Sequence, residues 1–151
     1  MPNIGLRFLV CVCCISTVLC SCIENSYEDN GVCKSCPANS VSDAGTVFIT
    51  ECMCIPGFER IDTLCVSCNT GFFKNTTSND MCTQCETGRV SLQGSTSELA
   101  CVLCASGLYV QTQPSGLVCT VCPLQSLAKI GGTSVASCTC NPGFIGEGVQ
   151  K

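Results

Sequence analysis

Only one long apolar run stands out along this chain, and it lies at the N-terminus. Residues 8–20 are 13 mostly apolar residues that follow Arg7, the single charged residue among the first 23. A membrane span needs about 20 apolar residues, whereas the hydrophobic region of a secretory signal peptide has about 7–15. We therefore predict a signal peptide over residues 1–22, cleaved after Cys20 or Cys22. Residues 23–32 are then a polar linker.

Beyond residue 32, apolar residues come in short segments separated by Gly, Ser, Thr, Asn and Cys. Segments such as residues 46–50 and 107–113 have the length of β-strands in hairpins. No helix is predicted in the mature chain, and no other stretch reaches the roughly 18 apolar residues of a transmembrane helix. The pattern predicts a small disulfide-rich fold of short hairpins.

Composition changes this picture in one respect, because 19 of the 151 residues are cysteine. With six Phe, two Tyr and no Trp, the chain cannot build one large core, so covalent cross-links must offset the chain entropy. The net charge of −4 and the scattered basic residues exclude a nucleic-acid footprint. The absence of His removes the commonest general base and the commonest metal ligand, and no metal site is expected.

Cysteine spacing has two interpretations. Cys-x-x-Cys recurs five times, at 33/36, 65/68, 82/85, 101/104 and 119/122. In a cytosolic chain this spacing would indicate zinc sites, but secretion exposes the cysteines to an oxidising compartment, where disulfides persist. We therefore predict structural disulfides among fourteen residues: Cys33, Cys36, Cys52, Cys54, Cys65, Cys68, Cys82, Cys85, Cys101, Cys104, Cys119, Cys122, Cys138 and Cys140.

The loops between cysteines form an internal repeat. One kind opens with Cys-x-x-Gly and an apolar residue, at Gly57, Gly71, Gly107 and Gly143. The other kind holds 15 residues and has Gly nine positions after its first cysteine, at Gly45, Gly94 and Gly131. The period of about 36–37 residues predicts an elongated array in which each unit contacts its neighbours. We divide it into a partial repeat over residues 33–64 and repeats over 65–100 and 101–151. The Phe or Tyr after the glycine is expected to pack on the nearby disulfide.

Spacing leaves two disulfide schemes open. In the first, four-cysteine units are closed as 33–52, 36–54, 65–82, 68–85, 101–119 and 104–122. In the second, each loop is closed by its own bordering cysteines, as 22–33, 36–52, 54–65, 68–82, 85–101, 104–119 and 122–138. By analogy with the loop between Cys54 and Cys65, Cys140 should be followed by a cysteine near position 151, where the sequence stops at Lys151. We expect a truncated chain in which Cys140 lacks its partner.

These motifs resemble the ephrin-receptor-like cysteine-rich repeat, an EGF-related module found in ephrin receptors and in large surface proteins, including those of protists. The resemblance rests on Cys65-x2-Cys68-x2-Gly-Phe-Phe, Cys82-x2-Cys85 and the Ser/Thr/Gly-rich loop to Cys101. A second copy runs to Phe144 and has the Cys-x-Cys-x-Pro-Gly-Phe ending. The chain departs from the module where Cys85 is followed by Glu rather than Pro, and where Cys101 and Cys104 are spaced Cys-x-x-Cys instead of Cys-x-Cys. The resemblance implies an elongated array of EGF-like repeats with no catalysis and no cofactor.

We expect an extracellular module, secreted or at the cell surface, that binds a protein or glycan partner. It has no transmembrane helix of its own and could belong to a longer membrane-anchored protein. The alternative is a purely structural coat or stalk spacer. A secreted thiol–disulfide oxidoreductase is less consistent with five Cys-x-x-Cys motifs and no helix to lower a thiol pKa. Asn75-Thr76-Thr77 makes Asn75 a candidate for N-glycosylation. The acidic residues before Cys33 fit a solvated linker better than an EGF-type calcium site.

Overall fold

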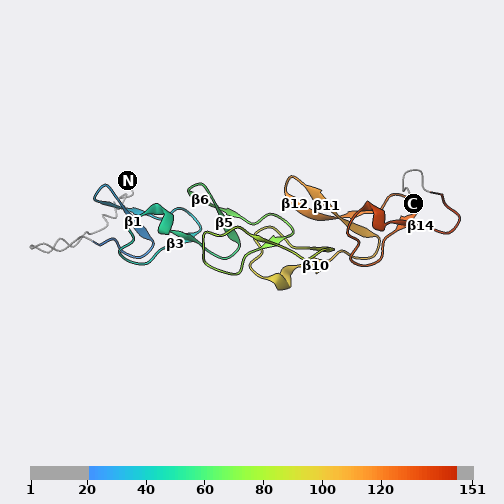
Figure 1. Cartoon of the computed structure of the whole chain (residues 1–151), viewed down its shortest axis with the longest axis horizontal. Coiled ribbons are helices and arrows are strands. Elements are labelled where there is room, and N and C mark those ends of the chain that lie inside the picture. Colours follow the sequence, from blue (N-terminus) through green and yellow to red (C-terminus); the bar gives the residue numbers. More distant parts are fainter. Residues whose placement is uncertain (1–20, 146–151) are drawn as a thin grey trace, which may run out of the picture.

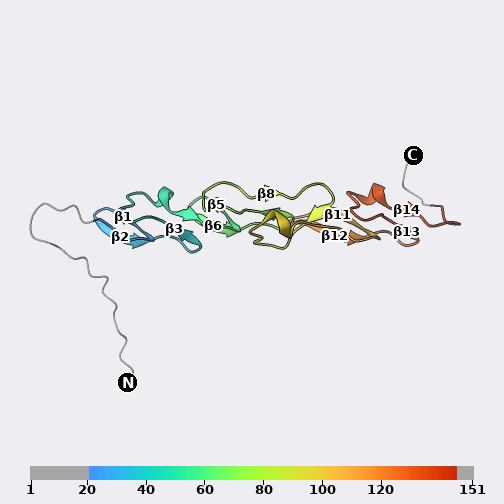
Figure 2. The same cartoon turned by 90° about the horizontal axis from the view of Figure 1, so that it is seen from below.

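The computed structural model describes residues 21–145, which form one extended array (Figure 1). Strand β1 lies at one end and β14 at the other, and the chain keeps the same narrow, elongated outline when turned by 90° (Figure 2). All but the last two residues of the predicted signal peptide lie outside the described residues.

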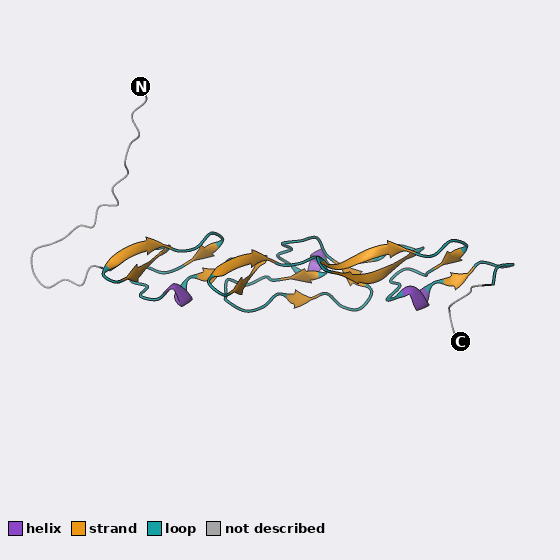
Figure 3. Ribbon diagram, turned by 90° about the horizontal axis from the view of Figure 1, so that it is seen from above, coloured by secondary structure: helices purple, strands orange, loops and turns teal. Residues whose placement is uncertain are grey.

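Seven two-stranded antiparallel sheets follow one another along the described part of the chain (Figure 3). Three are hairpins with two-residue turns: β1 (Ser26–Asp29) with β2 (Val32–Ser35), β5 (Phe58–Ile61) with β6 (Leu64–Ser67), and β11 (Leu108–Gln113) with β12 (Gly116–Val121). The first turn is Asn30-Gly31, with φ of 54° and 78°, which is the turn chemistry that favours a tight hairpin.

The other four sheets have two residues a strand. They pair β3 (Ser40–Val41) with β4 (Met53–Cys54), β7 (Phe72–Phe73) with β8 (Thr83–Gln84), β9 (Arg89–Val90) with β10 (Val102–Leu103), and β13 (Ser126–Leu127) with β14 (Thr139–Cys140). Three single-turn 3-10 helices, η1 (Ile49–Glu51), η2 (Glu98–Ala100) and η3 (Val135–Ser137), each end directly before the cysteine that closes a 15-residue loop. The predicted small, strand-dominated, disulfide-rich fold is confirmed.

Of the two strands predicted from the sequence, one is confirmed and one is wrong. The strand predicted over residues 107–113 is present as β11. The strand predicted over residues 46–50 is wrong, because the Glu51 carboxylate accepts the backbone N–H groups of Val47 and Phe48 at 3.0 and 3.1 Å. This capping arrangement turns the chain into η1 instead of letting it pair as a strand.

The buried interior consists almost entirely of sulfur. Among the described residues, the buried apolar side chains are nine disulfide cysteines and Ala128. The aromatic side chains after the loop-opening glycines do not join this interior: Phe58, Phe72 and Tyr109 are half-buried and Phe144 is exposed. Disulfides therefore replace the hydrophobic core that a chain so poor in aromatics cannot assemble.

The predicted segment boundaries do not follow the covalent structure. Residues 23–32, expected to be a linker, contain β1 and the turn to β2, and the Cys22–Cys33 disulfide closes this hairpin. Boundaries at residues 33, 65 and 101 each separate the two cysteines of one disulfide. The array is a succession of closed loops that share their junctions.

Candidate functional site: a disulfide-closed loop array

Every disulfide in the described residues joins two cysteines that are consecutive in the sequence. The pairs are Cys22–Cys33, Cys36–Cys52, Cys54–Cys65, Cys68–Cys82, Cys85–Cys101, Cys104–Cys119 and Cys122–Cys138. This is the second of the two schemes that spacing left open, and no disulfide of the first scheme is present. Cys140 is exposed and has no disulfide partner within residues 21–145.

A single backbone rule places each loop. The third residue after every loop-opening cysteine has a left-handed φ between 61° and 89°. Glycine supplies this conformation at five of the eight positions, and Asn25, Asn39 and Gln125 supply it at the others. In the hairpin loops, the carbonyl of this left-handed residue accepts a hydrogen bond from the cysteine that opens the next loop. For example, the Cys68 N–H donates to the Gly57 carbonyl at 2.8 Å. Cys140 obeys the same rule through Gly143, at φ 89°.

The 15-residue loops fold back on the loop that precedes them. In all three, the glycine nine positions after the first cysteine donates its N–H to the carbonyl of an earlier cysteine. These bonds are Gly45 to Cys22 at 2.7 Å, Gly94 to Cys68 at 2.8 Å and Gly131 to Cys104 at 2.8 Å. The repeat seen in the sequence is therefore a repeated loop–loop contact.

Close backbone approaches reinforce these contacts. A Cβ on Gly57 would lie 2.5 Å from the Gly94 carbonyl oxygen, and one on Gly88 would lie 2.6 Å from the Gly131 carbonyl oxygen. A side chain at either glycine would force two loops apart.

The longest hairpin reaches back further still. Near the β11–β12 turn, the Ser115 carbonyl accepts the N–H of Thr70 at 3.1 Å, and Leu117 donates to the Thr70 carbonyl at 2.8 Å. The sequence separation is 45 residues for the first of these bonds, so this hairpin ties the Cys104 loop to the Cys68 loop.

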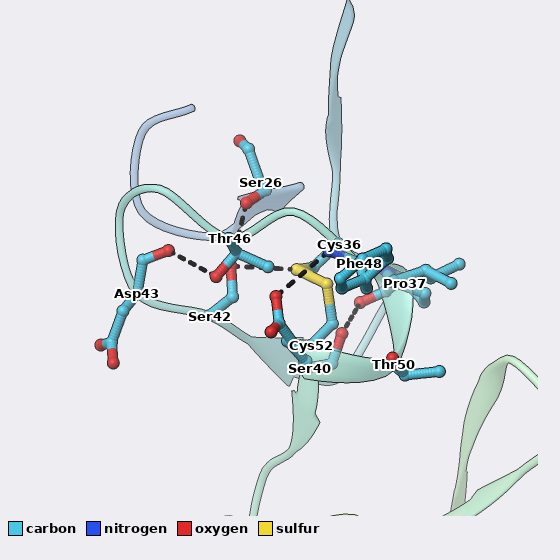
Figure 4. The surroundings of a disulfide bond; sticks show 12 residues. Ser26, Cys36, Pro37, Ser40, Ser42, Asp43, Thr46, Phe48, Thr50 and Cys52 are labelled. Atoms are coloured by element: carbon cyan, nitrogen blue, oxygen red, sulfur yellow. Dashed lines mark hydrogen bonds between the residues drawn. A yellow bond between two sulfur atoms is a disulfide. The ribbon is translucent and has the colours of Figure 1, made fainter. Parts of the chain in front are cut away.

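Hydroxyl groups of the 15-residue loops donate hydrogen bonds to backbone carbonyls of their own loop or of the loop before it, which gives the Ser and Thr residues of these loops a structural role. Around the Cys36–Cys52 disulfide, Ser40 donates to the Pro37 carbonyl at 2.7 Å and Ser42 donates to the Ser26 carbonyl at 3.1 Å (Figure 4). The Cys122 loop repeats the first of these bonds, from Ser126 to Pro123 at 2.7 Å.

Comparison with known proteins finds ephrin receptors. The chain is 35% identical over 102 residues, 66% of its length, to ephrin type-A receptor 3 of Danio rerio. It is 30% identical over 120 residues, 76% of its length, to ephrin type-A receptor 4-B of Xenopus laevis, and 32% identical over 93 residues to ephrin type-B receptor 2 of Gallus gallus. The chain carries ephrin-receptor-like cysteine-rich repeats. It spans only about a tenth of the length of these relatives. No family model matches the chain.

One junction of the ephrin-receptor-like repeats is built on a buried charge. Lys74 is only 4% exposed, and its ammonium donates to the carbonyls of Phe58, at 2.8 Å, and Ser78. Burial lowers the pKa of Lys74 below its ordinary value of 10.5, against the opposing effect of the Asp80 and Glu59 charges. Sequence reasoning missed this residue, since a lone lysine after two phenylalanines gives no signal of burial.

Asn79 ties the same loop of the ephrin-receptor-like array to its predecessor. Its side chain donates to the Thr50 carbonyl at 2.8 Å and accepts the Cys54 N–H at 3.2 Å. Because Ser78 also donates its N–H to the Cys54 carbonyl at 3.0 Å, the Cys68 loop is fixed to the first part of the array at three points.

Two features of the ephrin-receptor-like repeats bear on the metal and thiol–disulfide chemistry considered from the sequence. Throughout residues 21–145, no group of three or more His, Cys, Asp or Glu side chains could hold a metal ion. In each Cys-x-x-Cys motif the two cysteines bond to different partners, such as Cys33 to Cys22 and Cys36 to Cys52. A dithiol oxidoreductase instead cycles a disulfide between the two cysteines of one motif, and that pairing is not found in the described residues.

The remaining predicted site is Asn75. It is exposed and lies in an irregular stretch after β7, and its side chain makes no hydrogen bond with the described residues. Within the same part of the chain, the structure has no helix with the length and hydrophobicity that a membrane crossing requires.

Proposed function

We propose that this chain is an extracellular interaction module of a receptor-like or adhesion protein, which binds a protein or glycan partner along its length. The observation that carries the proposal is the outward placement of its large apolar side chains. Leu99 and Leu124 are 92% and 95% exposed, and both lie on 15-residue loops. Since disulfides form the interior, these side chains do not serve the core and are available to a partner.

Three features support an extracellular location. Seven disulfides persist only in an oxidising environment, the curated relatives are receptors, and residues 8–20 have the pattern of a signal peptide. Of the two candidate cleavage sites, we favour the one after Cys20, because cleavage after Cys22 would remove a cysteine that closes the first hairpin loop.

A second function, that of a rigid spacer, is favoured by a different observation. Backbone hydrogen bonds cross every junction between hairpin loops and 15-residue loops. The bond of greatest sequence separation in the described residues, from Leu117 to the Thr70 carbonyl, spans 47 residues. A chain held in this way would keep any domains attached to it at a fixed separation whether or not it binds a partner.

Binding to intact cells distinguishes the two functions. The full chain, secreted from cultured eukaryotic cells, is titrated onto cells of the source organism and onto a glycan array. Saturable binding that falls in a Leu99→Ser, Leu124→Ser double variant, with the seven disulfides intact, supports the interaction module. A Thr87→Ala, Thr133→Ala variant on the same loops serves as the control. If no cell type and no glycan gives saturable binding, the interaction proposal fails and the spacer stands.

A further inference from the structure

We propose that a groove at the N-terminal end of the array binds an extended basic peptide segment, with an apolar side chain flanked by lysine or arginine. This acidic groove has a volume of about 600 Å³ and is lined by Glu24, Val41, Asp43, Ala44, Met53 and Thr77, among others. A second hollow of about 480 Å³ adjoins it and shares Glu24 and Ala44. The proposal rests on the interaction function proposed above and names the partner's chemistry.

The floor of the acidic groove is apolar and half-open. Val41 in β3 is the direct cross-strand neighbour of Met53 in β4, and their side chains are 38% and 46% exposed. Covering this pair with an aliphatic side chain of a partner would remove apolar surface from water. Thr77, from the Cys68 loop, also contributes to the lining.

The walls of the acidic groove are held in place before any partner arrives. Asn25 donates its N–H to the Ser42 carbonyl at 2.9 Å, and Gly45 donates to the Cys22 carbonyl at 2.7 Å. The Cys22–Cys33 and Cys36–Cys52 disulfides close the two loops that carry these residues. A partner would therefore meet a preformed site and would order little of the protein on binding.

Charge selects a cationic partner. Residues 21–54 contain five carboxylates and one basic residue, whereas residues 55–145 contain five carboxylates and four basic residues. The single base of the first part, Lys34, forms an ion pair with Asp29. Cleavage after Cys20 would add the α-ammonium of Ser21, but five carboxylates still exceed these two positive charges. The N-terminal end of the array thus keeps a net negative charge, which favours a positively charged partner.

Two of the groove carboxylates are available to such a partner. Within residues 21–145, no hydrogen bond reaches the carboxylate of Glu24 or Asp43, whereas Glu51 is engaged by the N–H groups of Val47 and Phe48. Figure 4 shows the Asp43 carboxylate directed away from the Cys36–Cys52 disulfide. In an extended peptide the two lysines that flank an apolar residue point to the face opposite to it. Their long, flexible side chains would therefore bend back past the peptide backbone to reach the carboxylates at the rim.

Fluorescence anisotropy tests the proposal with a defined probe. The secreted full chain is titrated into a fluorescein-labelled peptide of sequence GSKLKSG at low and at physiological ionic strength, and into the acidic counterpart GSELESG. We expect saturable binding of the lysine peptide that weakens as salt rises, and no binding of the acidic peptide. Loss of two exposed ion pairs in a Glu24→Gln, Asp43→Asn variant should weaken binding about three- to tenfold, which corresponds to about 0.7–1.4 kcal/mol.

Matched variants locate the effect. Glu86→Gln with Glu98→Gln makes the same charge change on another 15-residue loop and should leave the dissociation constant unchanged. Met53→Gln removes the apolar floor without altering charge and should also weaken binding. Equal affinity of the groove variant and the control variant overturns the proposal, as does the absence of lysine-peptide binding. The two proposals can fail separately. If the groove variants bind the lysine peptide as tightly as the wild type, while cell binding is saturable and depends on Leu99 and Leu124, the groove proposal fails and the interaction function stands.

Discussion

Replacing Gly88 by alanine tests whether the loop–loop contacts hold the array together. The new Cβ would lie 2.6 Å from the Gly131 carbonyl oxygen and 3.3 Å from the Gly131 carbonyl carbon. Because these are backbone atoms, no side-chain rotation can relieve the contact, and the two loops must separate. Gly31 provides a matched control, since its φ of 78° is close to the 81° of Gly88 and a Cβ there meets nothing within 4 Å.

The expected magnitudes follow from this geometry. A left-handed conformation costs an alanine about 1–2 kcal/mol, and both variants incur this cost. Overpacking against atoms that cannot move away adds about 1–3 kcal/mol. We therefore expect Gly88→Ala to destabilise its junction by about 2–5 kcal/mol, and Gly31→Ala to destabilise only its own hairpin turn by about 1–2 kcal/mol.

Amide hydrogen exchange, measured by NMR, reports the stability of the contact between the Cys85 loop and the Cys122 loop. The reporters are the Gly131 amide, which donates to Cys104 at 2.8 Å, and the Cys104 amide, which donates to Gly88 at 3.1 Å. In Gly88→Ala their exchange should accelerate by at least about 30-fold, since each 1.4 kcal/mol corresponds to a factor of ten and we expect at least about 2 kcal/mol. In Gly31→Ala it should not change. Equal acceleration in the two variants, or none in either, would refute the claim that the close approach at Gly88 stabilises the array.

Two further predictions concern Lys74 and one concerns Asn75. Lys74→Met leaves the Phe58 and Ser78 carbonyls without their donor, so it should lower the free energy of unfolding by about 1–3 kcal/mol per carbonyl, measured by urea denaturation with disulfides intact. Between the lowered pKa of Lys74 and 10.5, the unfolded chain binds more protons than the folded one, so stability should rise with pH in that window; a wild-type slope no steeper than that of Lys74→Met would contradict this. We expect a peptide N-glycosidase to lower the mass of the secreted wild-type chain, because Asn75 lies in an acceptor triplet. Asn75→Gln should abolish this mass decrease. Asn69→Gln, at an asparagine outside any acceptor triplet, should retain it, and a decrease that persists in Asn75→Gln would contradict the prediction.

The architecture could be predicted from the sequence because its main determinants are local. The cysteine spacing, the glycines after Cys54, Cys68 and Cys104, and the lack of apolar runs long enough for helices all act within a few residues. Each of them therefore leaves a readable pattern. The hairpin in residues 23–32 had such a pattern too, in Asn30-Gly31, but the surrounding charges suggested a linker.

The junctions could not be predicted, because their contacts join residues far apart in the sequence. Nothing local indicates that Lys74 meets the Phe58 carbonyl, or that Thr70 meets a hairpin turn 45 residues later. The loop rule was also obscured where Asn25, Asn39 and Gln125 adopt the left-handed conformation in place of glycine. Asparagine is a readable substitute because it tolerates this conformation, whereas glutamine gives no such signal.

The disulfide pairing was ambiguous for a related reason. Each junction holds two neighbouring cysteines, spaced Cys-x-x-Cys at five junctions and Cys-x-Cys at 52/54 and 138/140. From spacing alone, either cysteine could bond to the preceding or to the following part of the chain. The structure shows that each loop is closed by its own bordering cysteines.

Mapping the disulfides of the secreted chain tests the central claim most directly. Proteolysis without reduction, followed by mass spectrometry, should yield linked peptides for Cys22–Cys33, Cys36–Cys52 and each of the five later pairs of consecutive cysteines. Cleavage between the neighbouring cysteines of each junction, such as Cys65 and Cys68, is also needed to assign each link, and trypsin cannot provide it there because no basic residue lies between them. The account predicts these seven links and no others within residues 21–145. Links such as Cys33–Cys52 with Cys36–Cys54, or Cys65–Cys82 with Cys68–Cys85, would contradict it.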